Sequence, residues 1–246
     1  MPCASPAVQS GAGEKPNAIC GAPTFMHYDF SFAFLAEYSP LLVEGMLGTL
    51  LISVGASVLG FAIGISGAAV RLYGSRIASH AVAIYVEAIR NTPFLVQLFL
   101  FYFGLPAVGV RLGANSAAVI AMAFNVGAYS VEIFRSGLAG VHRGQIEAGL
   151  ALGLSGFQIF RKIMLVPALR TVYPALTSQF ILVMLTSSVV SVVSATDLTA
   201  VANDIASITF RNFEIFLVVT LIYLLMSLGF AVLFRFVERR LFPFAN

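Results

Sequence analysis

Charged side chains are scarce in this sequence. Its 246 residues include 14 Lys and Arg residues and 11 Asp and Glu residues, so that 10% of the chain is charged while 59% is hydrophobic. An ordinary globular domain has about a quarter of its residues charged and needs polar side chains to cover its surface. The mean hydropathy of +0.93 therefore excludes a soluble fold and predicts a polytopic membrane protein.

Several chemical motifs are also missing. The cysteines, Cys3 and Cys20, lie outside every apolar run and define neither a disulfide framework nor a metal site. The lysines, Lys15 and Lys162, do not follow a Gly, so no G-x-x-x-x-G-K-[ST] phosphate-binding loop exists. No His/Cys cluster, nucleophile elbow or HExxH motif is present. The sequence predicts no catalytic residue, no metal site and, with a net charge of only +3, no nucleic-acid partner.

The first 26 residues lack a positively charged start followed by an apolar core, so they are not a secretory signal peptide. Their Pro, Gly, Ser and Ala content predicts a flexible tail over residues 1–26, with Met26 as an alternative start. The rest, residues 27–246, is predicted to be one transmembrane domain.

Apolar segments long enough to span a membrane as helices, roughly 20 residues each, occur five times. None shows the alternating pattern of a membrane β-barrel, and helices satisfy their own backbone hydrogen bonds in lipid. The sequence therefore predicts an all-α membrane protein with five spans, at about residues 41–69, 81–106, 114–136, 171–195 and 213–236.

The distribution of Lys and Arg predicts the orientation of these spans, because cytoplasmic loops carry an excess of both. One side holds Arg71, Arg76, Arg135, Arg143, Arg161, Lys162, Arg170, Arg235, Arg239 and Arg240, and the other holds Lys15, Arg111 and Arg211. This asymmetry predicts an outside N-terminus, a cytoplasmic C-terminus and a cytoplasmic loop between spans three and four.

That loop, residues 144–167, reads GQIEAGLALGLSGFQIFRKIMLVP. Its apolar residues recur at roughly helical spacing, with small residues between them that allow another surface to approach closely. Spacing alone leaves two interpretations open, a helix lying on the membrane interface and a helix that docks on a partner.

The same stretch resembles the EAA loop of ABC-importer permeases. The matching residues are Glu147, Ala148, Ala151, Gly153, Phe160 and Pro167. Gly149 stands where the commonest form has a second Ala. In that family the loop is a short coupling helix, here at about residues 144–156, held in a groove of a separate ATPase. The resemblance implies coupling to an ATPase through Glu147, Ala148, Gly149, Ala151, Gly153 and Leu154.

Other stretches resemble the polar amino-acid branch of the same family. They are YVEAIRNTPFLVQLFLFYFGLP at residues 85–106, NVGAYSVEIFRSGL at residues 125–138 and GQIEAG at residues 144–149. The resemblance covers most of residues 41–240 and implies a type I importer fold with a cytoplasmic coupling helix between spans three and four.

Polar side chains inside the spans are candidates for gating or for the substrate pathway. Thr92 and Pro93 predict a kink, because Pro frees a backbone carbonyl that neighbours must satisfy. Gln97 and Asn125 lie near mid-span, where an interhelical hydrogen bond and substrate contact are both open interpretations.

Charged side chains inside the spans come in two pairs three residues apart, Glu87 with Arg90 and Glu132 with Arg135. Such charges are costly in lipid unless paired, so we expect ion pairs with a structural role near the cytoplasmic boundary. A proton relay is the alternative.

The stretch from residue 178 to residue 199, which begins in the fourth span, resembles the region that lines the substrate cavity in the family. Gln179, Ser187 and Ser188 match and are implied to line the substrate pathway, and Asp197 matches the acidic exit position. Leu185 takes the position where many members have Lys, so that a different permease, or backbone dipoles, would compensate a substrate charge.

The resemblance implies a permease subunit that moves polar amino acids across the bacterial inner membrane. Its implied partners are a second permease, identical or sequence-related, two ATPase subunits that bind ATP and Mg, an extracytoplasmic amino-acid-binding protein and membrane lipid. The chain itself needs no cofactor. The alternatives are an ABC permease for another small solute, an ion-coupled secondary transporter and a scaffold subunit that uses residues 144–156 only for docking.

Overall fold

The computed structural model describes residues 30–140, 143–159, 163 and 165–241, and the regular elements in these ranges are all helices. The predicted tail and Phe160 lie outside the described residues. Phe32–Asn246 form one compact unit. Its elements are α1 (Phe34–Tyr73), α2 (Arg76–Arg90), α3 (Phe94–Phe99), η1 (Leu100–Gly104), α4 (Leu105–Ala107), α5 (Ala114–Ala139), α6 (Arg143–Ala151), α7 (Gly156–Ile159), α8 (Leu165–Thr186), η3 (Ser187–Val193), α9 (Leu198–Thr209) and α10 (Asn212–Leu241).

The prediction of an all-helical membrane-type fold is confirmed for the described residues. Helices long and apolar enough to cross a membrane are Phe34–Tyr73, Ala114–Ala139, Pro167–Val193 and Asn212–Leu241. They correspond to the first, third, fourth and fifth predicted spans. α1 has 40 residues, or about 60 Å at 1.5 Å per residue, so it is twice as long as the hydrocarbon layer is thick.

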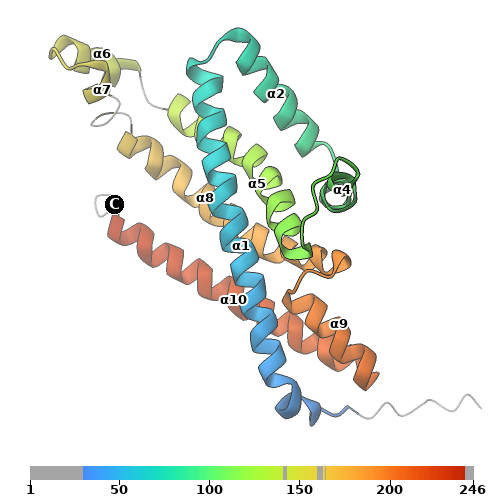
Figure 1. The fold of residues 1–246 in the computed structure, drawn as a ribbon. Coiled ribbons are helices and arrows are strands. Elements are labelled where there is room, and N and C mark those ends of the chain that lie inside the picture. Colours follow the sequence, from blue (N-terminus) through green and yellow to red (C-terminus); the bar gives the residue numbers. More distant parts are fainter. Residues whose placement is uncertain (1–29, 141–142, 160–162, 164, 242–246) are drawn as a thin grey trace, which may run out of the picture. The chain divides into compact units, whose positions relative to one another are not determined.

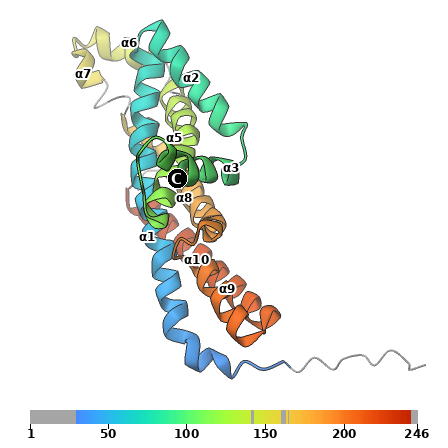
Figure 2. The ribbon, with the colours of Figure 1, turned by 45° about the vertical axis from the view of Figure 1, so that its right-hand side comes forward.

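The second predicted span, residues 81–106, is interrupted by a complete break where the sequence predicted a kink. α2 ends at Arg90, α3 begins at Phe94, and a π-helix, η1, follows from Leu100. Pro93 causes the break, because it has no N–H to donate and keeps the residue before it out of the helical conformation. Figures 1 and 2 show α2 returning alongside α1 and α5 and the chain changing direction at α3. A count of five crossings therefore depends on this broken segment.

Small residues on one face of α1 allow it to pack closely on α9 near its start and on α5 further along. They recur every three or four positions and are buried: Gly45, Thr49, Ser53, Ala56, Gly60, Gly64 and Ala68. A Cβ on Gly60 would lie 2.7 Å from Val126, and one on Gly64 would lie 2.3 Å from Cβ of Ser130. Such close packing is how membrane helices associate without a hydrophobic driving force.

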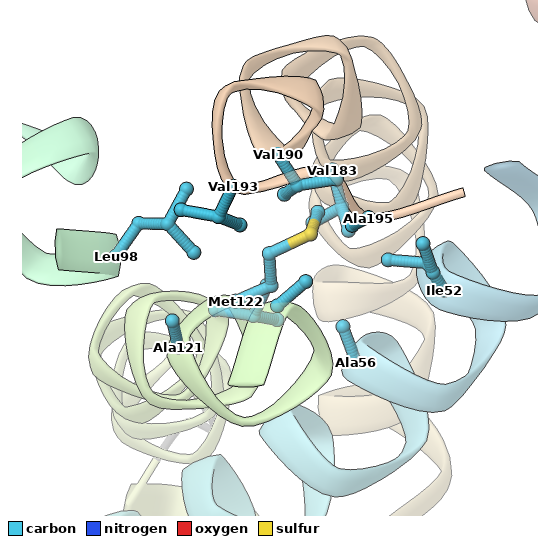
Figure 3. Close-up of a cluster of buried hydrophobic side chains, with 11 residues drawn as sticks. Ile52, Ala56, Leu98, Ala121, Met122, Val183, Val190, Val193 and Ala195 are labelled. Carbon is cyan, nitrogen blue, oxygen red and sulfur yellow. The ribbon is translucent and has the colours of Figure 1, made fainter. Parts of the chain in front are cut away.

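A buried apolar cluster joins α1, α3, α5, α8 and η3. Met122 of α5 lies in its middle, and Leu98 of α3 reaches it from one side (Figure 3). The other labelled members include Ile52, Ala56, Val183, Val190 and Val193. This cluster fixes the broken segment against the long helices, although α3 has only six residues.

Candidate functional site

α6 and α7 form a short hairpin between α5 and α8. α6 ends at Ala151, earlier than the predicted helix over residues 144–156, and α7 begins at Gly156. Gly153 explains the early end, because its φ is +73° and this left-handed conformation favours glycine. Leu154 N donates to Gly149 O at 3.1 Å, and Gly153 N donates to Leu150 O at 2.9 Å. This is the Schellman pattern of a helix C-terminus.

One side of α6 is open. Glu147, Ala148, Leu150, Ala151 and Leu152 are exposed, and we name these five residues the α6 surface. Leu150 is 59% exposed and Leu152 is 79% exposed. Neighbouring exposed apolar side chains make the α6 surface a candidate for contact with a partner protein or with the membrane interface.

Gly149 lies on the opposite side of α6 and is buried. A Cβ at this position would lie 2.6 Å from Cδ1 of Ile163 and 3.1 Å from Cγ1 of Ile159. Gly149 therefore belongs to the packing of the hairpin rather than to the α6 surface. Leu154 is half-buried, and Gly153 is exposed in the turn.

The break at Pro93 is closed by Gln97, which is 5% exposed. Its Nε2 donates to Ile89 O at 2.8 Å, to Thr92 O at 3.1 Å and to Thr92 Oγ1 at 2.8 Å. The sequence predicted that neighbours would bond the freed carbonyls, and the neighbour that does so is Gln97, one turn further along the same segment. Asn125 of α5 adds the interhelical bond, its Nδ2 donating to Gln97 Oε1 at 2.9 Å.

Asn125 and Gln179 meet at a small cavity of about 30 Å³ between α3, α5 and α8. Thr186 and Leu182 also line it. Leu182 is 56% exposed, so the cavity lies at an open face of α8 and not in the sealed interior.

The other predicted pathway residues do not line this cavity. Ser187 is buried, and its Oγ donates to Met184 O at 2.7 Å. Ser188 is half-buried and donates to Leu185 O at 2.8 Å. The structure therefore brings two of the five predicted residues together, places Gln97 behind them and turns both serines back to carbonyls of α8. Leu185 is 40% exposed.

The charged pairs differ from each other. Arg135 Nη2 lies 2.6 Å from Glu132 Oε2, which is the ion pair expected from their spacing. Glu87 and Arg90, both described, form no ion pair; the guanidinium of Arg90 instead lies over the Tyr129 ring, 5.4 Å from its centre. The expected pair on α2 is therefore wrong. Arg90 makes a cation–π contact with Tyr129 in place of the expected ion pair.

Asp197 is the N-cap of α9 and is completely buried. Its Oδ1 accepts from Ala200 N at 3.0 Å, and its Oδ2 accepts from Thr199 N at 3.1 Å and from the Tyr223 hydroxyl at 3.3 Å. Burial raises the pKa of this carboxyl above its usual range, while the two N–H groups and the hydroxyls of Tyr223 and Thr199 oppose the rise.

Two partners of this N-cap were absent from the sequence prediction. Thr49 of α1 accepts from Leu198 N at 3.0 Å, and Tyr223 of α10 also lies 3.1 Å from Thr199 Oγ1. They are remote in sequence, so no local pattern points to them.

Pro167, predicted as a structural residue, is exposed in the first turn of α8.

A buried carboxylate on α10 was also missed. Glu214 is 0% exposed and its Oε1 lies 3.0 Å from Nη1 of Arg211. The spacing of three residues is the same signal that was used for the other charged pairs. Across the described ranges, no group of three His, Cys, Asp or Glu residues is placed to hold a metal ion.

Residues 56–243 match the family described as "Binding-protein-dependent transport system inner membrane component". The chain is 37% identical over 218 residues to the glutamine transport system permease protein GlnP of Escherichia coli (strain K12), covering 88% of this chain and 99% of that protein. It is 33% identical over 209 residues to the probable glutamine ABC transporter permease protein GlnM of Bacillus subtilis (strain 168), covering 85% and 97%.

A solved structure, an amino acid ABC transporter with histidines, superposes with a TM-score of 0.81 and 35% identity, covering 87% of this chain and 100% of that one.

Proposed function

Because this chain belongs to the inner membrane components of binding-protein-dependent transport systems, we propose that it is the permease subunit of an ABC importer for polar amino acids. The full-length similarity to glutamine permeases and to an amino acid transporter carries this proposal. The bacterial inner membrane is the corresponding location.

The α6 surface is the proposed docking site for a separate ATPase, which binds ATP and Mg. Its exposed leucines, Leu150 and Leu152, supply apolar contact area, and Glu147 supplies a charge that selects the partner. The Schellman turn at Gly153 and the packing of Gly149 hold the hairpin in one shape. ATP-driven closure of the ATPase pair would then shift the permease between inward- and outward-facing states.

In the proposed topology the N-terminus is periplasmic and the C-terminus is cytoplasmic. The broken segment from α2 to α4 is the second of five crossings. This arrangement places the turn between α1 and α2 and the α6–α7 hairpin on the same side, and Figures 1 and 2 both draw them at the same end. Arg71, Arg76, Arg235, Arg239 and Arg240 would all face the cytoplasm, as the excess of Arg on cytoplasmic loops requires.

A second permease subunit and an extracytoplasmic binding protein complete the proposed importer. The substrate would pass the open face of α8, where Gln179 and Asn125 lie, with Ser187 and Ser188 further along the same span. Thr92 and Pro93 form a bend suited to gating, and Glu132 with Arg135 stabilises the cytoplasmic end of α5. Leu185 leaves this face without a cation.

The test of coupling is Gly153→Leu in proteoliposomes that contain the permease, its ATPase and its binding protein. A side chain is unfavourable in the left-handed conformation by about 1–2 kcal/mol, so the turn should rearrange while the membrane helices remain folded. ATP hydrolysis should continue while uptake of labelled amino acid falls. Gly144→Leu is the matched control, because Gly144 is exposed on α6 with no atom within 4 Å of a built Cβ and no positive φ.

Normal uptake by Gly153→Leu would contradict docking through α6. Uptake that needs an ion gradient and not ATP would instead indicate a secondary transporter, and an ionophore separates the two.

Orientation is tested by single cysteines in a background in which Cys3 and Cys20 are replaced by Ser. Ser155→Cys in the hairpin should label only from the cytoplasmic side, and Asn203→Cys on α9 should label from outside. Labelling of Ser155→Cys in intact cells by an impermeant reagent would overturn the topology.

Subunit composition is tested by expressing this permease alone with the ATPase and the binding protein. Efficient uptake would indicate a homodimer. Uptake only with a second, sequence-related permease would indicate a heterodimer in which the partner supplies the cation absent at Leu185.

A further inference from the structure

A series of hydrogen bonds leads from the break at Pro93 to the cavity beside Asn125. Pro93 has no N–H to donate to the Ile89 carbonyl, and Thr92 precedes α3, whose first N–H groups bond Pro93 O, so that the Thr92 carbonyl has no helical donor either. Both accept from Nε2 of Gln97, at 2.8 Å and 3.1 Å. The Thr92 hydroxyl donates to Ala88 O at 2.9 Å, so its lone pair faces the same Nε2 at 2.8 Å.

These contacts allow only one orientation of the Gln97 amide. Carbonyl oxygens only accept, so the group beside Ile89 and Thr92 must be the amide nitrogen. Oε1 of Gln97 therefore points to Asn125 and must receive a donor, which is Nδ2 of Asn125 at 2.9 Å. Asn125 is oriented in turn, and its Oδ1 remains an acceptor.

This acceptor has room for a small group beside it. Asn125 and Gln179 line a cavity of about 30 Å³, and no described residue donates a hydrogen bond to Asn125 Oδ1 or bonds the amide of Gln179. A water molecule, or a group of that size, fits such a volume. A whole amino acid does not, so the cavity can receive only one functional group of a larger molecule.

We propose that Asn125 Oδ1 accepts a hydrogen bond from an N–H donor group of the transported solute, an ammonium or a primary amide, and that Gln97 is the positioning residue that fixes this polarity. The inference rests on the proposed function. Beside Oδ1 a donor group is favoured over a carboxylate, whose oxygens would face another oxygen, while the Gln179 amide is able to donate to an acceptor of the same solute. In this proposal Gln97 does not contact the solute. It orients the Asn125 amide, so that Oδ1 and not Nδ2 faces the solute.

The experiment measures binding of labelled L-glutamine to the purified permease–ATPase complex in detergent, without the binding protein. N-acetyl-L-glutamine, which lacks the ammonium, and L-glutamate, which lacks the primary amide, are the competitors. Asn125→Leu should weaken L-glutamine binding by about 10- to 100-fold, the usual loss for a hydrogen bond to a charged group. Asn115→Leu is the matched control on α5, since Asn115 bonds Thr196 and lies outside the cavity.

Gln97→Leu tests whether Gln97 orients the Asn125 amide or only stabilises the fold. It frees the Asn125 amide to turn, so the preference for L-glutamine over the weaker analogue should shrink by about tenfold, while the thermal midpoint of the complex reports any general loss of fold. If N-acetylation removes the effect of Asn125→Leu, the group is the ammonium; if replacement by L-glutamate removes it, the group is the amide.

Equal binding of all three compounds to the wild-type complex, or unchanged L-glutamine affinity in Asn125→Leu, would overturn the inference. If Asn125→Leu fails to assemble, L-glutamine binding by Asn125→Ser and the binding of the two analogues to the wild-type complex test the same inference. Absence of ATP-dependent uptake by the wild-type importer would instead contradict the proposed function, which keeps the two failures apart.

Discussion

Two interruptions of the membrane helices, one between α2 and α3 and one between η3 and α9, are closed by opposite chemistry. At the first, Pro93 frees carbonyl oxygens, and the amide nitrogen of Gln97 donates to them. At the second, Ser194 adopts φ +58° and α9 begins with free N–H groups, to which the carboxylate of Asp197 provides the acceptors. In lipid, freed backbone groups must be satisfied within the protein, and each break has its own side chain for this purpose.

The two networks differ in whether they are complete. The partners of Asp197 come from α9 and α10, and Thr49 of α1 accepts from the neighbouring Leu198 N. The Gln97 network ends at Asn125, whose Oδ1 faces a cavity. A complete buried network stabilises one conformation, whereas one with a spare acceptor at an open face is suited to binding. This difference is the reason why the proposed solute contact lies at the break near Pro93 and not at the start of α9.

Asp197→Ala should produce the largest loss of stability. It removes an N-cap, leaves the N–H groups of Thr199 and Ala200 without this acceptor and takes one partner from the Tyr223 hydroxyl, at a cost of about 2–4 kcal/mol. Unfolding by SDS in mixed micelles measures this. Asp204→Ala on the same helix is the control, because Asp204 is exposed. Equal losses for the two variants would remove the distinction between the networks.

Gln97→Leu should cost less, about 1–2 kcal/mol, because the Ile89 carbonyl keeps Thr92 N as a donor at 3.5 Å. Its larger effect should be on hydrogen exchange of the amides next to the break, from Asn91 to Val96. A loss of stability larger than that of Asp197→Ala would mean that the Gln97 network, and not the Asp197 network, contributes more to the stability of the fold.

Tyr223→Phe should cost about 1 kcal/mol, the typical value of one hydrogen bond, since Asp197 keeps both backbone donors. Thermal unfolding of this variant beside Ser227→Ala, a half-buried position on α10 whose hydroxyl donates to Leu224 O, isolates the effect of the Tyr223 hydroxyl. A negligible change would mean that Tyr223 only packs against the carboxylate.

The smallest expected effect is a dependence on pH. Burial raises the pKa of Asp197 in the folded protein, so the folded chain holds the proton more tightly than the unfolded chain does. This stabilisation is fully present below the unfolded pKa of about 3.9 and is lost as the pH rises through the raised value. Asp197→Asn should remove that component of the slope of unfolding free energy at pH values above the unfolded pKa of about 3.9. An identical slope in the variant would contradict the assignment.

The sequence predicted the features that depend on local patterns. Hydropathy identified the four long helices, and Pro93 identified the bend. It did not predict that the bend becomes a complete break, because this depends on Gln97 and on the packing of Leu98 against Met122.

The site was predictable as a set of residue types but not as an arrangement. Asn125 and Gln179 meet only through the packing of α5 on α8. The hydroxyls of Ser187 and Ser188 donate to carbonyls one turn earlier, and a pattern of polar residues does not show which way a hydroxyl points. Gly149 looked like part of the coupling motif and is instead buried in the hairpin. The small residues of α1 carried a readable signal, spaced every three or four positions, that was not used.

The pairing of α1 with α5 has a consequence for biosynthesis. Residues 74–113 separate the two helices, so α1 leaves the ribosome well before the partner that its glycine face fits. At about 5–20 residues per second, synthesis of this intervening segment takes roughly 2–8 s. During that interval the narrow face of α1 is open to other helices or to insertion factors, and the α2–α4 segment is the first part of the chain able to shield it.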